Sequence, residues 1–508
     1  MSGLGLVAQA GTIGALTEAI GLVFTGQTLL WIVVGLVLGM IGGALPGVGS
    51  SLSMAIILPL TLPLSPVNAI ILLVSMYSGA MYGGSIAAIL VNVPGTGAAA
   101  ATTFDGYPMS QQGRAVDALS MSATASSVAG FLSVLTLLLI SPLLIEVVLL
   151  FGSPENFMMA VLGLAMIAIV ARGSVVKAIV SGGFGLMITA IGIAPNSPEL
   201  RYTFGQIGLR NGVDFIAALI GMFAIAEMIK LAGQEGGIAD SAIEMTGNRL
   251  AGVRETFQHP LTLVKSGYIG MLIGAIPGAG ATVSNFIAYG EAMRSSVTPE
   301  RFGKGEPLGV IAAEASNNGT IGGSLIPTIA FGIPGSGSTA VLLGGLLMHG
   351  LRPGPQLFET DLHLTYTFLI ALLIGNFFIL FAGVVFVTRM GRLTQIDTHV
   401  IIPIVVVLSM VGGFTLNNNW MDILTVILLG LIGYLMVKYN YSVIAFVLGV
   451  VLGPIAEENL LRSLQISGGD YSVFVSPGQQ PIAFALLVVT ILILVGPFVK
   501  PRLERALS

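Results

Sequence analysis

The sequence has no cysteine, few histidines and few charged residues. Without cysteine, the chain cannot form disulfides, iron–sulfur clusters or thiolate zinc sites. The four histidines, His259, His349, His363 and His399, lack the spacing of a metal site. Only 9% of the residues are charged, and the net charge of −4 gives no reason to expect a nucleic-acid partner.

Basic residues are absent from the beginning of the chain. No lysine or arginine precedes Arg114, and Glu18 is the single charged residue among the first 104. A secretory signal peptide needs a basic leading region. We therefore expect the N-terminus to be an interfacial segment before the first membrane span, not a cleaved signal peptide.

What the sequence does contain is long apolar segments. Hydrophobic residues make up 55% of the chain and charged residues 9%. A soluble domain carries about 25% charged residues. One membrane-spanning helix needs about 20 apolar residues, so we expect an all-α, multi-pass membrane protein with about ten to fourteen segments. The run Ala118–Phe151 is predicted to cross twice, with a break at Ser141 and Pro142.

Two sequence landmarks occur twice in the same order. GMIGGALPGVGSSLS (39–53) and GMLIGAIPGAGATVS (270–284) are identical at eight of fifteen positions. GGSIAAILVNVPGTG (83–97) pairs in the same way with GGSLIPTIAFGIPGSG (322–337). Internal repeats are typical of transporters, and two crossings by Ala118–Phe151 would make the repeats inverted. The predicted division is into repeats 1–240 and 241–508, with broken helices near 43–63, 83–103, 274–290 and 322–345.

The Pro-Gly pairs in these landmarks predict broken helices. Proline removes a backbone donor and glycine permits unusual backbone angles. The helix that restarts has unpaired N–H groups and the positive end of its dipole, which favour an anion. Packing kinks are the structural alternative, but four duplicated breaks favour a binding site. The predicted substrate-binding residues are Pro46, Gly47, Gly49, Ser50, Ser51, Pro94, Gly95, Thr96, Gly97, Pro277, Gly278, Gly280, Thr282, Ser284, Asn285, Pro334, Gly335, Ser336, Gly337 and Ser338.

Polar residues within apolar sequence are candidates for a coupling-ion site. Glu314, Asn317 and Asn318 lie in IAAEASNNG, and Asn92 lies in LVNVPG. A carboxylate at membrane depth suggests function, although a buried structural partner is an equal alternative for Glu314. The segment 104–117, with its charged side chains, is interpreted as a solvated polar loop.

Catalysis and nucleotide binding are not expected. The glycine-rich segments lack the Gly-Lys-Ser/Thr ending of a phosphate-binding loop. No nucleophile with an acid–base partner and no metal set is recognisable, so the chain is not predicted to be an enzyme.

The chain resembles the large membrane subunit of the tripartite tricarboxylate transporter family. The resemblance rests on GALPGVGSS, YGGSIAAILVNVPGTGAAAATTFDGYPMSQQGRA, GAIPGAGATVSNFIAYG and GGSLIPTIAFGIPGSGSTAVLLGGLLMHGLRPGP. It implies a bacterial inner-membrane protein that works with a small four-span subunit and a periplasmic solute-binding protein. Import of citrate, other tricarboxylates or related organic acids would be driven by a Na⁺ or H⁺ gradient, with no other cofactor. An elevator mechanism with re-entrant hairpins is also implied. A stand-alone carrier or an anion channel for small organic acids is the alternative.

Overall fold

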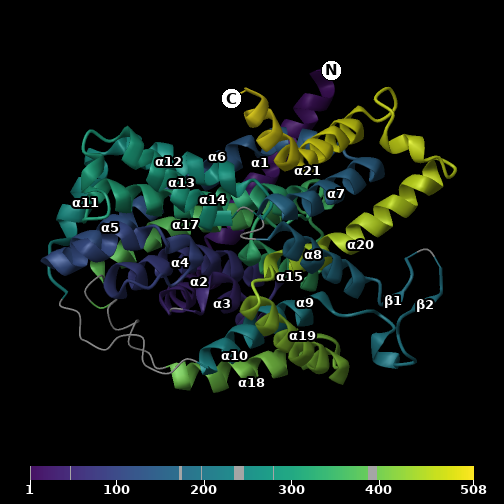
Figure 1. Ribbon diagram of the computed structural model, residues 1–508, viewed down its shortest axis with the longest axis horizontal. Helices are drawn as coiled ribbons and strands as arrows, with labels where there is room; N and C mark the ends of the chain where they lie inside the picture. The colour runs from purple at the N-terminus through teal and green to yellow at the C-terminus, as the bar shows by residue number, and fades with distance from the viewer. Residues whose placement is uncertain are drawn as a thin grey trace.

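The protein is built almost entirely from α-helices (Figure 1). The computed structural model describes residues 2–45, 47–170, 174–195, 197–233, 245–278, 280–386, 389 and 398–507. The helices are α1 (Ser2–Val23), α2 (Gly26–Ala44), α3 (Gly49–Ile57), α4 (Pro66–Val91), α5 (Thr102–Met109), α6 (Ala115–Val148), α7 (Ser153–Val170), α8 (Val175–Thr189), α9 (Phe215–Leu219), α10 (Ala226–Ala232), α11 (Arg249–Gln258), α12 (Pro260–Gly274), α13 (Gly280–Ser295), α14 (Pro307–Phe331), α15 (Gly337–Met348), α16 (Pro355–Glu359), α17 (Leu362–Val385), α18 (Thr398–Asn417), α19 (Trp420–Lys438), α20 (Val443–Ile466) and α21 (Pro481–Leu507). A short antiparallel pair, β1 (Gly192–Ile193) with β2 (Leu200–Arg201), is the sheet in these residues.

Seven helical segments in the described part of the chain are long and apolar enough to cross a membrane. They are Gly26–Ala44, Pro66–Val91, Thr102–Val148, Phe215–Ala232, Leu362–Val385, Trp420–Lys438 and Val443–Ile466. This is fewer than the ten to fourteen expected from the sequence. Other apolar helices are shorter, including α8 and α15, because glycine, proline or a turn ends them before a full span.

The prediction that Ala118–Phe151 crosses twice is wrong. Helix α6 is continuous through this region, and Pro142 lies inside it. Proline cannot donate to the carbonyl four residues earlier, which belongs to Leu138. The Ser141 hydroxyl donates to that carbonyl at 2.7 Å, so the freed acceptor is satisfied and the helix continues. The crossing count on which the inverted orientation was based therefore fails, and the orientation stays a prediction.

The helices form neighbouring groups that pack side by side (Figure 1). The first group contains α2–α6, α11–α15 and α17; a second contains α7, α8, α20 and α21; a third contains α9, α10, α18 and α19. Glycines permit the closest contacts in the first group. A Cβ at Gly39 would lie 2.2 Å from the Met76 carbonyl oxygen, and one at Gly323 would lie 1.9 Å from that of Met271. Such small-residue contacts are typical of helices that pack in membranes.

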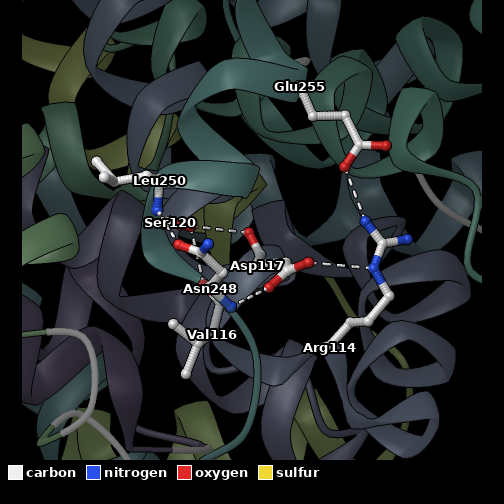
Figure 2. Close-up of polar contacts among 7 residues, drawn as sticks. All are labelled: Arg114, Val116, Asp117, Ser120, Asn248, Leu250 and Glu255. Carbon is white, nitrogen blue, oxygen red and sulfur yellow. Dashed lines mark hydrogen bonds and ion pairs between the residues drawn. The ribbon is translucent and has the colours of Figure 1, made fainter.

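A polar clamp fixes the start of α6 to the segment before α11 (Figure 2). The Asp117 carboxylate accepts the backbone N–H of Asn248 at 2.6 Å and the Arg114 Nε at 3.2 Å. Arg114 Nη2 also donates to Glu255 at 2.7 Å. Gly247 passes close to Asp117 with φ +118°, a conformation that glycine adopts readily. The clamp joins the two halves of the chain just after residues 234–244.

The interpretation of segment 104–117 as a solvated loop is wrong. The segment is helical, and Asp105 and Asp117 are buried. Asp105 accepts hydrogen bonds from the Tyr289 hydroxyl at 2.8 Å and from the backbone N–H groups of Gly305 and Glu306 at 2.9 and 2.8 Å. Backbone donors that lie 131 to 201 residues away along the chain satisfy these carboxylates, and a local reading of the sequence cannot anticipate them.

Replacement of Asp117 by alanine should destabilise the protein. The change leaves the Asn248 N–H and the Arg114 Nε–H without their acceptor, with an expected loss of about 2 kcal/mol. Thermal unfolding of the purified variant measures the effect. Glu458→Ala is the control, because its ion pair with Arg462 is 57% exposed on both sides and such pairs contribute about 0–1 kcal/mol. Equal melting temperatures for the two variants would contradict the clamp.

Candidate functional site

A cavity of about 750 Å³ lies where the broken-helix segments of the first group meet the other two groups. Its size is within the range of about 300–1,000 Å³ that is usual for small-molecule sites. The predicted substrate residues that line it are Gly47, Gly49, Ser50, Ser51, Pro94, Gly95, Thr96, Gly97, Gly278, Gly280, Thr282, Ser336, Gly337 and Ser338. The structure therefore brings segments from all four predicted breaks to one space.

Glycines shape the first pair of breaks. Gly47 and Gly49 have φ of +86° and +66°, and Gly278 and Gly280 have φ of +78° and +60°. L-residues with a side chain rarely adopt these angles, so each chain turns where the glycines lie. Helix α3 begins at Gly49 and helix α13 at Gly280. The first turns of both helices face the cavity.

The second pair of breaks also shares a local conformation. Helix α4 ends at Asn92 with φ +57°, and helix α14 ends at Gly332 with φ +67°. Each of these left-handed residues stands two positions before the proline of its Pro-Gly pair. After the second break, α15 begins with a reciprocal cap between Ser336 and Thr339, so its first turn also starts at the cavity wall.

Hydrogen bonds hold the tips of the broken helices together. The Ser338 hydroxyl lies 2.7 Å from the Ser50 hydroxyl and 3.2 Å from that of Ser51, joining α15 to α3. The Gly278 N–H donates to the Gly335 carbonyl at 3.0 Å. The serine contacts cross between the two predicted repeats, and the Gly278–Gly335 bond joins the two breaks of the second repeat.

Three α-helix N-termini therefore meet at one cavity. Helices α3, α13 and α15 each place their first residues in its lining. Unpaired N–H groups and the positive dipole ends favour an anion there. The hydroxyls of Ser50, Ser51 and Thr282 add neutral donors in the same wall.

The cavity lining also contains residues that sequence reasoning missed. Glu227 and Lys230 of α10 line the cavity, as do Asn440, Tyr441 and Ser442 between α19 and α20. Lys230 donates to Glu227 at 2.7 Å, and both side chains remain partly exposed. The sequence did contain a signal for these residues: in AIAEMIKLA, an acid and a base stand three residues apart near the end of an apolar run.

Several predicted substrate residues lie outside the lining. Pro277, Pro334 and Gly335 belong to the turns behind it, and Pro46 is outside the described residues. Ser284 and Asn285 are fully buried in α13. Ser284 lies 2.9 Å from the Thr320 hydroxyl, and Asn285 accepts from the Ala101 N–H and donates to the Ala313 carbonyl. Ser284 and Asn285 therefore connect α13 to neighbouring segments instead of contacting the cavity.

The predicted ion-coupling residues fall into two groups. Asn92 is exposed at the C-terminus of α4 and does not line the cavity. Glu314, Asn317 and Asn318 are fully buried in α14, behind the cavity wall. No group of three or more His, Cys, Asp or Glu side chains that could hold a metal was found in the described ranges.

Comparison with known proteins adds a family to this geometry. Residues 29–448 match the Tripartite tricarboxylate transporter TctA family. The chain is 33% identical over 425 residues to an "uncharacterized 52.8 kDa protein in TAR-I ttuC' 3'region" of Agrobacterium vitis, covering 84% of each chain. It is also 29% identical to an "uncharacterized protein in TAR-II ttuC' 3'region" of the same organism, over 46% of this chain and 98% of that relative. No solved structure matches the chain.

Proposed function

Because the chain belongs to the tripartite tricarboxylate transporter TctA family, we propose that it is the large transmembrane subunit of a secondary transporter that imports carboxylate anions. The substrates would be tricarboxylates such as citrate, or related organic acids. The observation that carries the proposal is the convergence of the N-termini of α3, α13 and α15 on one cavity. Helix N-termini at broken helices are the usual place for substrate carboxylates in secondary transporters.

The charge distribution in the cavity supports an anionic substrate with more than one carboxylate. The broken-helix tips offer backbone N–H groups and hydroxyls, and Lys230, paired with Glu227, offers a positive charge. A substrate with two carboxylates would contact the helix N-termini with one and Lys230 with the other. The substrate carboxylates are charged, and each hydrogen bond to a charged group contributes about 1.5–3 kcal/mol to binding.

The arrangement of the helix groups supports an elevator-like movement. The cavity lining combines the broken-helix tips of the first group with residues of α8, α10 and α20 from the other groups. Movement of the first group against the other two would carry the substrate across the membrane, while the broken-helix tips stay bound to the substrate. In this proposal the partners are a small four-span subunit and a periplasmic binding protein, in a bacterial inner membrane.

Uptake of labelled citrate into vesicles tests this proposal. The vesicles would hold the chain with its small subunit, with or without the binding protein, under separate Na⁺ and H⁺ gradients. We expect saturable uptake that requires the binding protein and one gradient. Gradient-driven uptake without the binding protein would instead support a stand-alone carrier, and non-saturable flux would support a channel. Absence of uptake for citrate, dicarboxylates and aromatic acids alike would overturn the proposal.

A further inference from the structure

A carboxylate without a cationic partner lies inside the first helix group. Glu314 has 0% exposure. It accepts hydrogen bonds from the Thr102 hydroxyl at 2.5 Å and the Ser126 hydroxyl at 3.0 Å. None of the ion pairs formed by the described residues includes Glu314. Ser122 and Asn317 also donate to this carboxylate. A buried charge still needs a counter-charge, because neutral donors do not replace its hydration.

Three asparagine side chains nearby have oxygens without a donor in the described part of the protein. Asn317, Asn318 and Asn376 are buried, with exposures of 0%, 0% and 2%. Asn317 Nδ2 donates to the Met81 carbonyl at 3.0 Å, and Asn376 Nδ2 donates to that of Leu372 at 2.8 Å. The Oδ1 atoms of all three have no hydrogen-bond partner. The Nδ2 of Asn318 is unpaired as well. Buried polar atoms are seldom left unpaired, so these atoms indicate a bound ion or water.

The helix geometry brings these groups to one place. Glu314, Asn317 and Asn318 stand at positions i, i+3 and i+4 of α14, so they share one face. On α6, Ser126 contacts Glu314, and Gly130 follows one turn later. A Cβ at Gly130 would lie 2.3 Å from Asn376 Oδ1 and 3.4 Å from Asn318 Cβ. Asn376, from α17, and Asn318 therefore meet against α6, next to the Glu314 site.

We propose that α6, α14 and α17 form a buried Na⁺ site in which Glu314 supplies the charge and the asparagine Oδ1 atoms supply further ligands. Carboxylate and amide oxygens are the ligands of hard cations. A proton would neutralise Glu314 but would not satisfy the asparagine oxygens. One carboxylate balances a monovalent ion and leaves a divalent ion with excess charge.

The site lies behind the cavity, and Asn285 connects the two. Asn285 belongs to α13, whose first turn lines the cavity. Its side chain accepts from the Ala101 N–H at 2.7 Å and donates to the Ala313 carbonyl at 2.9 Å. Ala101 and Ala313 immediately precede Thr102 and Glu314. An ion that orders these residues would also order the cavity wall, and in this way Na⁺ binding would be coupled to substrate binding. This coupling role rests on the proposed function, whereas the Na⁺ site itself does not.

Binding of ²²Na⁺ to the full chain in lipid vesicles, without substrate and in choline buffer, tests the site. We expect saturable binding by the native chain, and about tenfold or greater loss of affinity in Glu314→Gln and Asn376→Leu, as for removal of a metal-orienting group. Asn376→Asp keeps an oxygen at this position and should retain binding. Asn459→Leu is the matched control, because Asn459 makes the same bond to a carbonyl four residues earlier, at 2.8 Å.

The outcomes separate the Na⁺ site from the proposed transport function. Absence of saturable Na⁺ binding by the native chain would overturn the site, and so would undiminished binding by both Glu314→Gln and Asn376→Leu. Citrate uptake driven by a proton gradient would leave the transport function intact in either case. Na⁺ binding that depends on Glu314 and Asn376 in a chain that moves no carboxylate would keep the site and overturn the transport function.

Discussion

The Gly278→Val variant should reach the membrane in normal amounts and lose about 10- to 100-fold of its carboxylate uptake, and Gly47→Val should behave in the same way. The glycines have φ of +78° and +86°, where a β-branched residue is strained by about 1–3 kcal/mol. The backbone would relieve this strain by rotating away from the positive φ, which would shift the turn that forms the cavity wall. In Gly278→Val it would also displace the N–H that donates to Gly335. Uptake into vesicles, divided by the amount of inserted protein, measures the effect.

Gly290→Val is the control for the loss of transport. Gly290 lies in α13, on the same helix that follows Gly278, and a Cβ there meets no atom within 4 Å. The variant therefore receives the same side chain without a strained turn, and near-normal uptake is expected. Normal uptake by Gly278→Val and Gly47→Val would show that the turns do not shape the transport site.

The broken-helix tips were the part of the site that sequence could predict. Glycine and proline act locally, because their backbone limits do not depend on distant contacts. The positive φ angles at Gly47, Gly49, Gly278 and Gly280 are therefore where the motifs placed the turns. The membrane class also followed from composition, since few charged residues remain in a chain of this length.

The part of the cavity lining that comes from α10 and from the segment between α19 and α20, and the buried polar contacts, could not be predicted in this way. Lys230 and Tyr441 come from segments without a Pro-Gly motif, and they face the cavity because three helix groups pack together. The continuity of α6 through Pro142 depends on one hydroxyl that replaces a lost donor. Asp117 and Asn376 are buried by partners far away in sequence. Each case depends on tertiary packing, which local sequence patterns do not report.

Loss of the Lys230 charge should weaken substrate binding more than it slows transport. Lys230 is the basic residue among the described residues that line the cavity. In Lys230→Gln, the substrate loses a charged partner, so the KM for citrate should rise about tenfold, with a smaller change in the maximal rate. Saturation curves for uptake at fixed gradient and fixed binding-protein concentration separate the two parameters. A substrate with one carboxylate should lose less than citrate, because the N-termini of α3, α13 and α15 can hold it alone.

The Glu227→Gln variant should have the opposite effect on KM. Glu227 accepts from Lys230 at 2.7 Å, so it competes with a substrate carboxylate for the same ammonium group. An exposed pair of this kind contributes about 0.2–1 kcal/mol, and its removal should lower KM by up to about fivefold. Lys304→Gln is the control, because it removes one exposed positive charge in the loop before α14, away from the cavity. If Lys304→Gln raised KM as much as Lys230→Gln, net charge would explain the effect. If KM rose in Glu227→Gln, the pair would act as a unit that holds α10 against the cavity, and Lys230 would not bind substrate directly.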